Sequence, residues 1–163
     1  MQVKTRNRLD KREENRQLSF LDACIFLEIL LSQPKKEECT KWIRSFRGKS
    51  KRAVISSYCL GEIVSNIYGA KEKYEKIDAG VAFLALDGLL NDNGITIVGI
   101  EASDIFKAIE IRSELDNRIS ARDALNLASA FNLDCVNFCT IETRISVETV
   151  RKLNMKLVSS FVQ

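Results

Sequence analysis

The chain has 163 residues, a formal net charge of +3 and hydrophobic side chains at 45% of its positions. This length matches one domain, and it suffices to bury a sizeable core without disulfides or a structural metal. The sequence contains no histidine, which excludes catalytic triads, general bases and zinc sites that depend on an imidazole. Any chemistry must therefore use carboxylates, hydroxyls, lysine, arginine or thiols.

The cysteines and the N-terminal residues bear on where the protein works. Five cysteines without a Cys-x-x-Cys pair predict buried thiols in a reducing compartment, not disulfides or a zinc site. The apolar runs are shorter than the ~20 residues of a membrane helix, and residues 1–17 are too charged for a signal peptide. We expect a cytoplasmic protein with no membrane partner, in which 1–17 is a charged extension, either disordered or a helix frayed from the body, and 18–163 is the folded domain.

In chain order, short apolar strands alternate with helical segments. Strands are expected at residues 18–21, 53–56, 95–100, 135–140 and 156–161. Helices are expected at residues 23–31, 34–46, 58–67, 70–90, 103–115, 120–131 and 146–153. Strands joined by helical crossovers pair in parallel. The pattern therefore predicts an α/β fold, a three-layer α/β/α sandwich with a central parallel sheet.

Four carboxylates are expected to meet at one edge of that sheet. Ligands of open parallel sheets bind beyond the carboxyl ends of the strands, and the acids that follow strands or begin helices at that edge are Asp22, Glu62, Asp123 and Glu142. Acids brought together raise each other's pKa, and a hard divalent cation relieves that conflict. Oxygen ligands suit Mg²⁺ or Mn²⁺, which activate water and bind phosphate. These residues indicate metal-assisted hydrolysis of a phosphodiester.

Each acid also has a purely structural explanation. Asp22 is placed to cap the helix that follows it, and Asp123 completes a pattern like a capping box with Ser120. Glu62 is explained equally well as a solvated helix residue and Glu142 as a charge in a loop. The hypothesis of a site depends on the four acids together.

Three stretches resemble, in order, the motif blocks of the PIN-domain family, with the VapC-type toxin ribonucleases as the most similar branch. They are FLDACIFLEILL (20–31), VISSYCLGEIVSNI (54–67) and SARDALNLASAFNLDCVNFCTIETR (120–144). The resemblance covers about residues 18–162 and is least specific over 70–93. It implies an α/β/α sandwich and an endoribonuclease that uses Mg²⁺ or Mn²⁺ to hydrolyse RNA.

The resemblance also implies roles for individual residues. Asp22, Glu62 and Asp123 match the first three catalytic and metal-binding acids of the family. Glu142 matches the fourth, in a block where the family usually has Thr-x-Asp and this chain has Thr-Ile-Glu. The glutamate keeps the charge and adds a methylene.

Further residues are expected around these acids. Ser57 and Thr140 match positions where a hydroxyl supports the site, and Asn126, one turn after Asp123, is placed to orient the substrate or a water on the metal. Arg122 and Arg144 are placed for the substrate phosphate. The basic stretch 44–52 precedes a strand, so we expect it at the opposite edge of the sheet, as a solvated loop.

Partners follow from the resemblance alone. VapC-type proteins use the helices after the second motif to form a dimer and to hold an antitoxin, so a homodimer and a cognate antitoxin are implied. The amphipathic run 74–90 is a candidate surface, although it is equally compatible with interior packing. Two other functions stay open: a catalytically inactive PIN-like module that binds RNA or protein, and an RNA-processing nuclease that is not a toxin.

Overall fold

The computed structural model describes residues 17–48, 52–73 and 78–159. Most of the predicted N-terminal extension, residues 1–16, lies outside this part of the chain. So do Lys49 and Lys51 of the basic stretch, and Tyr74 and Ile77 of the amphipathic run.

Five parallel strands form one sheet in the order β3-β2-β1-β4-β5. The strands are β1 (Leu18–Leu21), β2 (Arg52–Ser56), β3 (Thr96–Val98), β4 (Asn137–Cys139) and β5 (Lys156–Val158). The chain first builds outward from β1 through β2 to β3, and then crosses to the other side of β1 for β4. The order therefore reverses between β1 and β4, which is where open α/β sheets place their ligand sites.

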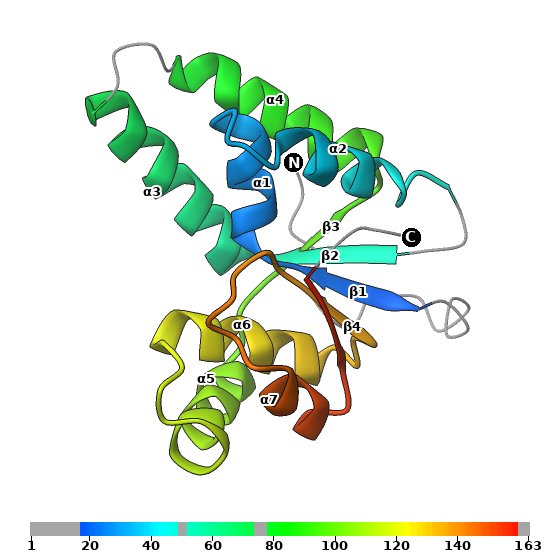
Figure 1. The fold of residues 1–163 in the computed structure, drawn as a ribbon, viewed down its shortest axis with the longest axis vertical. Coiled ribbons are helices and arrows are strands. Elements are labelled where there is room, and N and C mark those ends of the chain that lie inside the picture. The colour runs from blue at the N-terminus through cyan, green and yellow to red at the C-terminus, as the bar shows by residue number, and fades with distance from the viewer. Residues whose placement is uncertain (1–16, 49–51, 74–77, 160–163) are drawn as a thin grey trace.

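Helices cover both faces of the sheet (Figure 1). One layer contains α1 (Ala23–Leu30), α2 (Lys36–Arg44), α3 (Ser57–Lys73) and α4 (Ala79–Asp92). The other contains α5 (Ala102–Glu110), the π-helical turn η3 (Ile111–Leu115), α6 (Ala121–Asn132) and α7 (Val147–Lys152). The predicted three-layer sandwich with a parallel sheet is confirmed.

Two predicted helices differ in the structure from a single regular α-helix. The helix predicted over 70–90 is wrong as a single segment, because the backbone of Asp78 is extended (φ −83°, ψ 108°) and α4 begins at Ala79. The Asp78 carboxylate accepts hydrogen bonds from the amides of Gly80 (2.8 Å) and Val81 (3.1 Å), which starts a new helix. The helix predicted over 103–115 continues from α5 into η3, where the backbone hydrogen bonds change to the π pattern.

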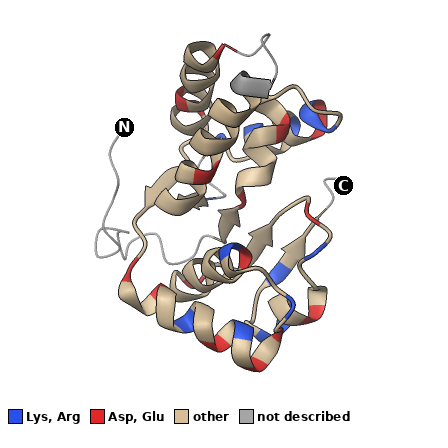
Figure 2. Cartoon of the chain, turned by 90° about the vertical axis from the view of Figure 1, so that its left-hand side faces the viewer, with Lys and Arg blue, Asp and Glu red and all other residues tan. Residues whose placement is uncertain are grey.

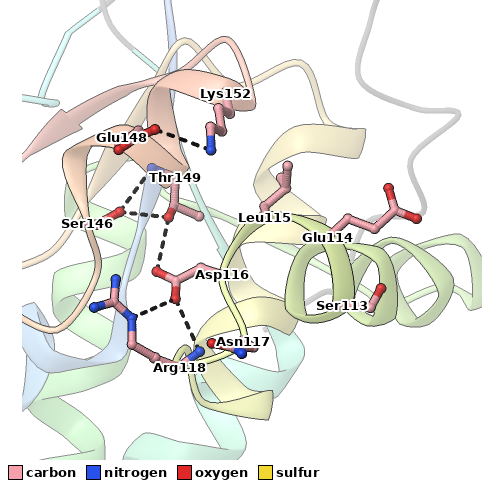
Figure 3. A pocket seen from close by; sticks show the side chains of 10 residues that line it. All are labelled: Ser113, Glu114, Leu115, Asp116, Asn117, Arg118, Ser146, Glu148, Thr149 and Lys152. Atoms are coloured by element: carbon pink, nitrogen blue, oxygen red, sulfur yellow. Dashed lines mark hydrogen bonds and ion pairs between the residues drawn. The ribbon is translucent and has the colours of Figure 1, made fainter.

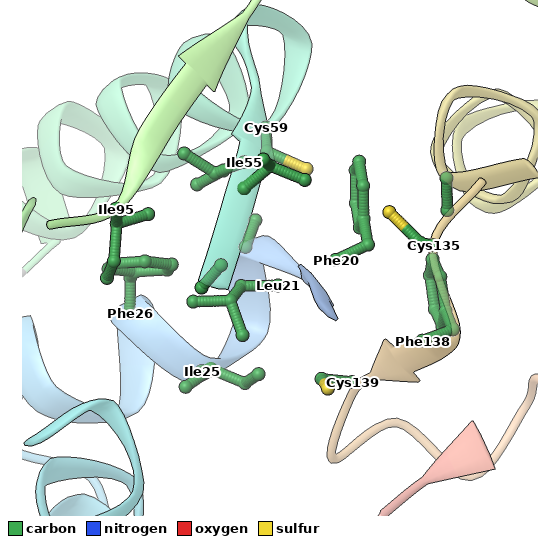
Figure 4. Packing of buried hydrophobic residues seen from close by; sticks show 14 of the residues in the cluster. Phe20, Leu21, Ile25, Phe26, Ile55, Cys59, Ile95, Cys135, Phe138 and Cys139 are labelled. Carbon is green, nitrogen blue, oxygen red and sulfur yellow. The ribbon is translucent and has the colours of Figure 1, made fainter. Parts of the chain in front are cut away.

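The core lies on both sides of β1 and β4. The rings of Phe20 and Phe138 stack across the two strands with centroids 5.5 Å apart, and Ile25 and Phe26 of α1 pack from one face (Figure 4). Truncation of a fully buried phenylalanine to alanine typically costs ~3–5 kcal/mol. This rigid centre fixes the position of the residues that directly follow β1 and β4.

Other expectations can be compared with the described residues. All five cysteines are free, and four of them are buried, as predicted. In the basic stretch Arg47 forms an ion pair with Asp92 at the end of α4 (3.1 Å). Within the part of the chain that the structure describes, no helix combines the length and apolarity needed to cross a membrane.

Candidate active site

Asp22 stands at the junction of β1 and α1, and it serves the fold as well as the site. Its backbone is extended (φ −77°, ψ 151°), and Oδ1 accepts a 2.8 Å hydrogen bond from the amide of Ala23, the first helical residue. Its own amide donates to the carbonyl of Cys139 at the end of β4 (3.0 Å). The capping explanation from the sequence is therefore correct, and the cap also places the carboxylate where the strand order reverses.

The rest of the Asp22 carboxylate is enclosed by polar side chains. The Thr140 hydroxyl donates to Oδ2 at 2.7 Å, and the Cys24 thiol donates to the same oxygen at 3.3 Å. The Asn126 amide donates to Oδ1 at 3.5 Å. Only 5% of Asp22 is exposed, so its orientation is fixed by these contacts.

Burial raises the pKa of Asp22 from 3.8 to about 6. The hydrogen bonds from Thr140 and Cys24 act in the opposite direction, because they stabilise the ionised carboxylate. The charges of Glu62 and Asp123 raise the pKa further. Two further predicted acids, Glu62 and Asp123, are thus close enough to Asp22 for their charges to act on it.

Asp123 lies in the first turn of α6, which Ser120 caps. The Ser120 hydroxyl accepts from the amide of Asp123 at 3.1 Å and donates to its Oδ2 at 2.7 Å. Asp123 is 7% exposed. As at Asp22, the local capping geometry orients a carboxylate toward the site instead of competing with that role.

Glu62 and Glu142 each form an ion pair with an arginine. Arg122 Nη1 lies 2.5 Å from Glu62 Oε1, which joins α6 to α3, and Arg144 Nε lies 2.9 Å from Glu142 Oε2 in the loop after β4. Neighbouring carboxylates raise the pKa of both guanidinium groups: for Arg122 these are Glu62 and then Asp123. For Arg144 they are Glu142 and then Asp123.

A buried row of polar groups behind Asp22 includes residues that the sequence did not single out. The Asn126 carbonyl oxygen accepts from the Ser56 hydroxyl (3.4 Å) and the Cys59 thiol (3.1 Å). Ser56 is fully buried at the end of β2, whereas the predicted Ser57 is half-buried at the start of α3. The sequence signal that could have identified Ser56 is the pair of adjacent serines at the end of β2. Only the fold decides which of the two side chains points into the protein.

Asn126 and Thr140 are both held inside the protein. Asn126 is 1% exposed and its amide is used by Asp22, Ser56 and Cys59, so the contacts that the structure shows support Asp22. Its role toward the substrate remains a prediction. Thr140 also accepts a 3.0 Å hydrogen bond from the amide of Glu142, which ties the loop after β4 to Asp22.

The chemistry of these donors fits a hard divalent cation, because the predicted ligands are all carboxylate oxygens. The burial of Asp22 beside two further acids supports this fit. Among the described residues, no three or more Asp, Glu, Cys or His side chains are already arranged to hold an ion. To bind the cation, Glu62 would have to release its ion pair with Arg122, and Glu142 its ion pair with Arg144.

A second polar pocket, of about 320 Å³, lies between η3, the loop that follows it and α7 (Figure 3). Its carboxylate, Asp116, accepts hydrogen bonds from the Arg118 amide (3.1 Å) and the Thr149 hydroxyl (3.2 Å). These hydrogen bonds, that of the Arg118 amide above all, hold the pKa of Asp116 below its usual value. None of the four predicted acids lines this pocket, and its central carboxylate is already held by Arg118 and Thr149.

Acidic and basic positions are interspersed along the layer of α5, η3 and α6 (Figure 2). This mixture agrees with the mild net charge of +3. Affinity for an anionic ligand at the candidate site would therefore depend on local cations such as Arg122 and Arg144.

Comparison with solved structures shows the same fold in three bacterial proteins. VapBC2 from Rickettsia felis, bound to a DNA fragment from its promoter, matches with a TM-score of 0.64 and 19% identity over 87% of this chain and 98% of that one. The Sarcin-Ricin loop cleaving toxin VapC20 from Mycobacterium tuberculosis matches with a TM-score of 0.56 and 16% identity, over 74% of this chain and 86% of that one. FitAcB from Neisseria gonorrhoeae matches with a TM-score of 0.56 and 17% identity, over 85% of this chain and 95% of that one.

No curated protein matches the sequence significantly. The family model of the PIN domain matches residues 19–151, which is most of the chain and includes all four predicted acids. The match agrees with the resemblance of the motif blocks. The chain belongs to the PIN-domain family.

Proposed function

We propose that this protein is a metal-dependent endoribonuclease, with Asp22, Glu62, Asp123 and Glu142 as ligands of Mg²⁺ or Mn²⁺. The observation that carries the proposal is the buried Asp22 carboxylate, whose pKa is raised to about 6 by burial and further acids at the reversal of strand order. Membership of the PIN-domain family supports nuclease activity. The likeness to VapC20, described as a toxin that cleaves the Sarcin-Ricin loop, supports RNA as the substrate.

The side chains of this chain have distinct roles in the proposal. A bound divalent cation supplies a Lewis acid for phosphate and water. Thr140 and Cys24 hold one oxygen of Asp22, and Asn126 holds the other, so that the carboxylate keeps one orientation. Arg122 and Arg144 carry half-exposed or exposed guanidinium groups beside the acids, from which each can contact a substrate phosphate.

We also propose that the protein is the toxin of a toxin-antitoxin pair, and that it forms a homodimer in the cytoplasm. The similarity to VapBC2 and FitAcB supports an antitoxin partner. On α4, which belongs to the amphipathic run predicted as a contact surface, Val81 and Leu84 are largely exposed. Expression of the protein alone should arrest growth, and co-expression of a neighbouring small gene product should restore it.

Cleavage of labelled single-stranded RNA tests the nuclease directly. We expect cuts with Mg²⁺ or Mn²⁺, none with EDTA, and none with Asp22→Asn or Asp123→Asn. Asp134→Asn, at an exposed position in the turn before β4, is the matched control and should cleave like the wild type. Cuts that persist in both site variants would reveal a contaminant and count against the assignment.

A second candidate, an inactive module that binds RNA, is favoured by one observation. Glu62 and Glu142 are already paired with arginines, and the described residues hold no ready-made cluster of metal ligands. Such a module would bind RNA in the absence of metal, and a calorimetric titration would detect no stoichiometric binding of Mn²⁺. Saturable Mn²⁺ binding that is lost in Asp22→Asn would exclude it.

A further inference from the structure

An open pocket lies on α3 directly beside the candidate active site. It has a volume of about 440 Å³, within the usual range of ligand pockets. The pocket shares Glu62 and Arg122 with the acidic site. The rest of its wall comes from Ser57, Tyr58, Gly61, Ser65 and Asn66, and we call it the α3 pocket.

The lining of the α3 pocket combines one exposed ring with polar groups. Tyr58 is 39% exposed, so much of its ring remains uncovered. Ser65 and Asn66 are exposed about two turns beyond Tyr58 along the helix. The Arg122 side chain is 48% exposed and has further donors beyond the nitrogen that contacts Glu62. An aromatic face, hydrogen-bonding groups and a guanidinium together match a base and its phosphate.

Gly61 keeps the pocket open. A Cβ added at Gly61 would meet no atom within 4 Å, so a side chain there would project into open space. Glycine inside a helix costs ~1 kcal/mol relative to alanine, and nothing in the packing of α3 around Gly61 requires its small size. The position can therefore be filled without damage to the fold.

We propose that the α3 pocket binds one unpaired base of the RNA substrate, beside the phosphodiester that is cleaved. Tyr58 stacks on the base, Ser65 and Asn66 contact its edge, and Arg122 contacts the adjoining phosphate. The inference rests on the proposed nuclease function. It adds a subsite that selects which nucleotide lies next to the cut.

Gly61→Leu fills the pocket and Gly69→Leu is its matched control. Gly69 lies in the same helix and also has no atom within 4 Å of an added Cβ, but it does not line the pocket. The full-length proteins are compared by melting temperature, by Mn²⁺-dependent cleavage of a single-stranded RNA of randomised sequence, and by fluorescence anisotropy with a short labelled RNA in EDTA.

We expect Gly61→Leu to melt no lower than the wild type, to bind the RNA at least ~10-fold more weakly and to lose the base preference at one position beside the cut. Gly69→Leu should match the wild type in all three measurements. Tyr58→Ala should weaken binding by about 5- to 150-fold, the range for one stacked base, and Tyr58→Trp should restore it. An abasic residue at that RNA position should weaken wild-type binding, with no further effect in Tyr58→Ala.

The possible failures differ from one another. If the wild type cleaves RNA and Gly61→Leu cleaves and binds it equally well, the pocket is not a subsite, while the nuclease proposal stands. If Gly61→Leu loses only a co-purified protein partner, the pocket is a protein-binding site and the inference is overturned. If the wild type neither cleaves nor binds RNA, the proposed function fails and the subsite fails with it.

Discussion

The Thr140 hydroxyl at the end of β4 donates a 2.7 Å hydrogen bond to Oδ2 of Asp22 at the end of β1. The two residues are 118 positions apart in the sequence. The same hydroxyl oxygen accepts from the amide of Glu142. The Thr140 side chain therefore couples Asp22 to the loop that carries Glu142.

Removal of this hydroxyl should impair the site more than the fold. In Thr140→Val the hydrogen bond that stabilises the ionised Asp22 is lost, so the pKa of Asp22 should rise further. Groups that orient metal ligands typically contribute 10- to 100-fold to affinity or activity, and we expect a loss of about that size in Mn²⁺ affinity by calorimetry. Thr140→Ser keeps the hydroxyl and should stay close to the wild type. Equal affinities for the valine variant and the wild type would contradict this role.

The raised pKa of Asp22 predicts how stability depends on pH in EDTA. Its folded-state pKa of about 6 lies above the ordinary 3.8, so the folded protein favours the protonated form. The associated stability is fully present below pH ~4 and is lost as the pH rises through ~6. At ~1.4 kcal/mol per pKa unit, the loss is on the order of 3 kcal/mol.

Asp22→Asn should remove that dependence. Denaturant unfolding in EDTA should show the variant and the wild type close in stability at pH 4, with the variant more stable at pH 7. A difference that stays constant between pH 4 and 7 would show that Asp22 is not desolvated as the structure indicates.

Asn126 should matter for stability as well as for the site. Asn126→Ala leaves Ser56 and Cys59 without their buried acceptor and removes a donor to Asp22. Each buried polar group left unsatisfied costs ~1–3 kcal/mol. We expect a destabilisation of roughly that size by urea unfolding. Asn117→Ala, at an exposed position, should change stability by less than ~0.5 kcal/mol.

The family-like variant Glu142→Asp tests the one acid that departs from the usual motif. The shorter carboxylate keeps the charge, and we expect it to retain Mn²⁺ binding. Glu142→Gln removes the charge and the ion pair with Arg144, and its affinity should fall at least ~10-fold. Calorimetry with Mn²⁺ separates the two variants. If Glu142→Gln binds Mn²⁺ like the wild type, Glu142 is a loop charge and not a ligand.

The sequence was sufficient for the architecture because its signals are local. Apolar strands alternating with helices predicted the parallel sheet, and Ser120 was correctly identified as a cap. The single helix predicted over 70–90 was wrong because hydrophobic periodicity continues across Asp78, whose capping bonds break the helix. The PIN-domain family was also identified from the motif blocks, and the family model confirms it.

The contacts within the site were decided only by tertiary structure. Asn126 reaches Asp22, and Ser56 reaches Asn126, because β1, β2 and α6 converge, and no spacing in the sequence encodes that convergence. The arginine pairs of Glu62 and Glu142 and the pocket beside Tyr58 likewise need packed helices and loops. Residue type and periodicity determine which acids reach the edge of the sheet. Burial and long-range hydrogen bonds, which depend on the whole fold, determine their charge and orientation.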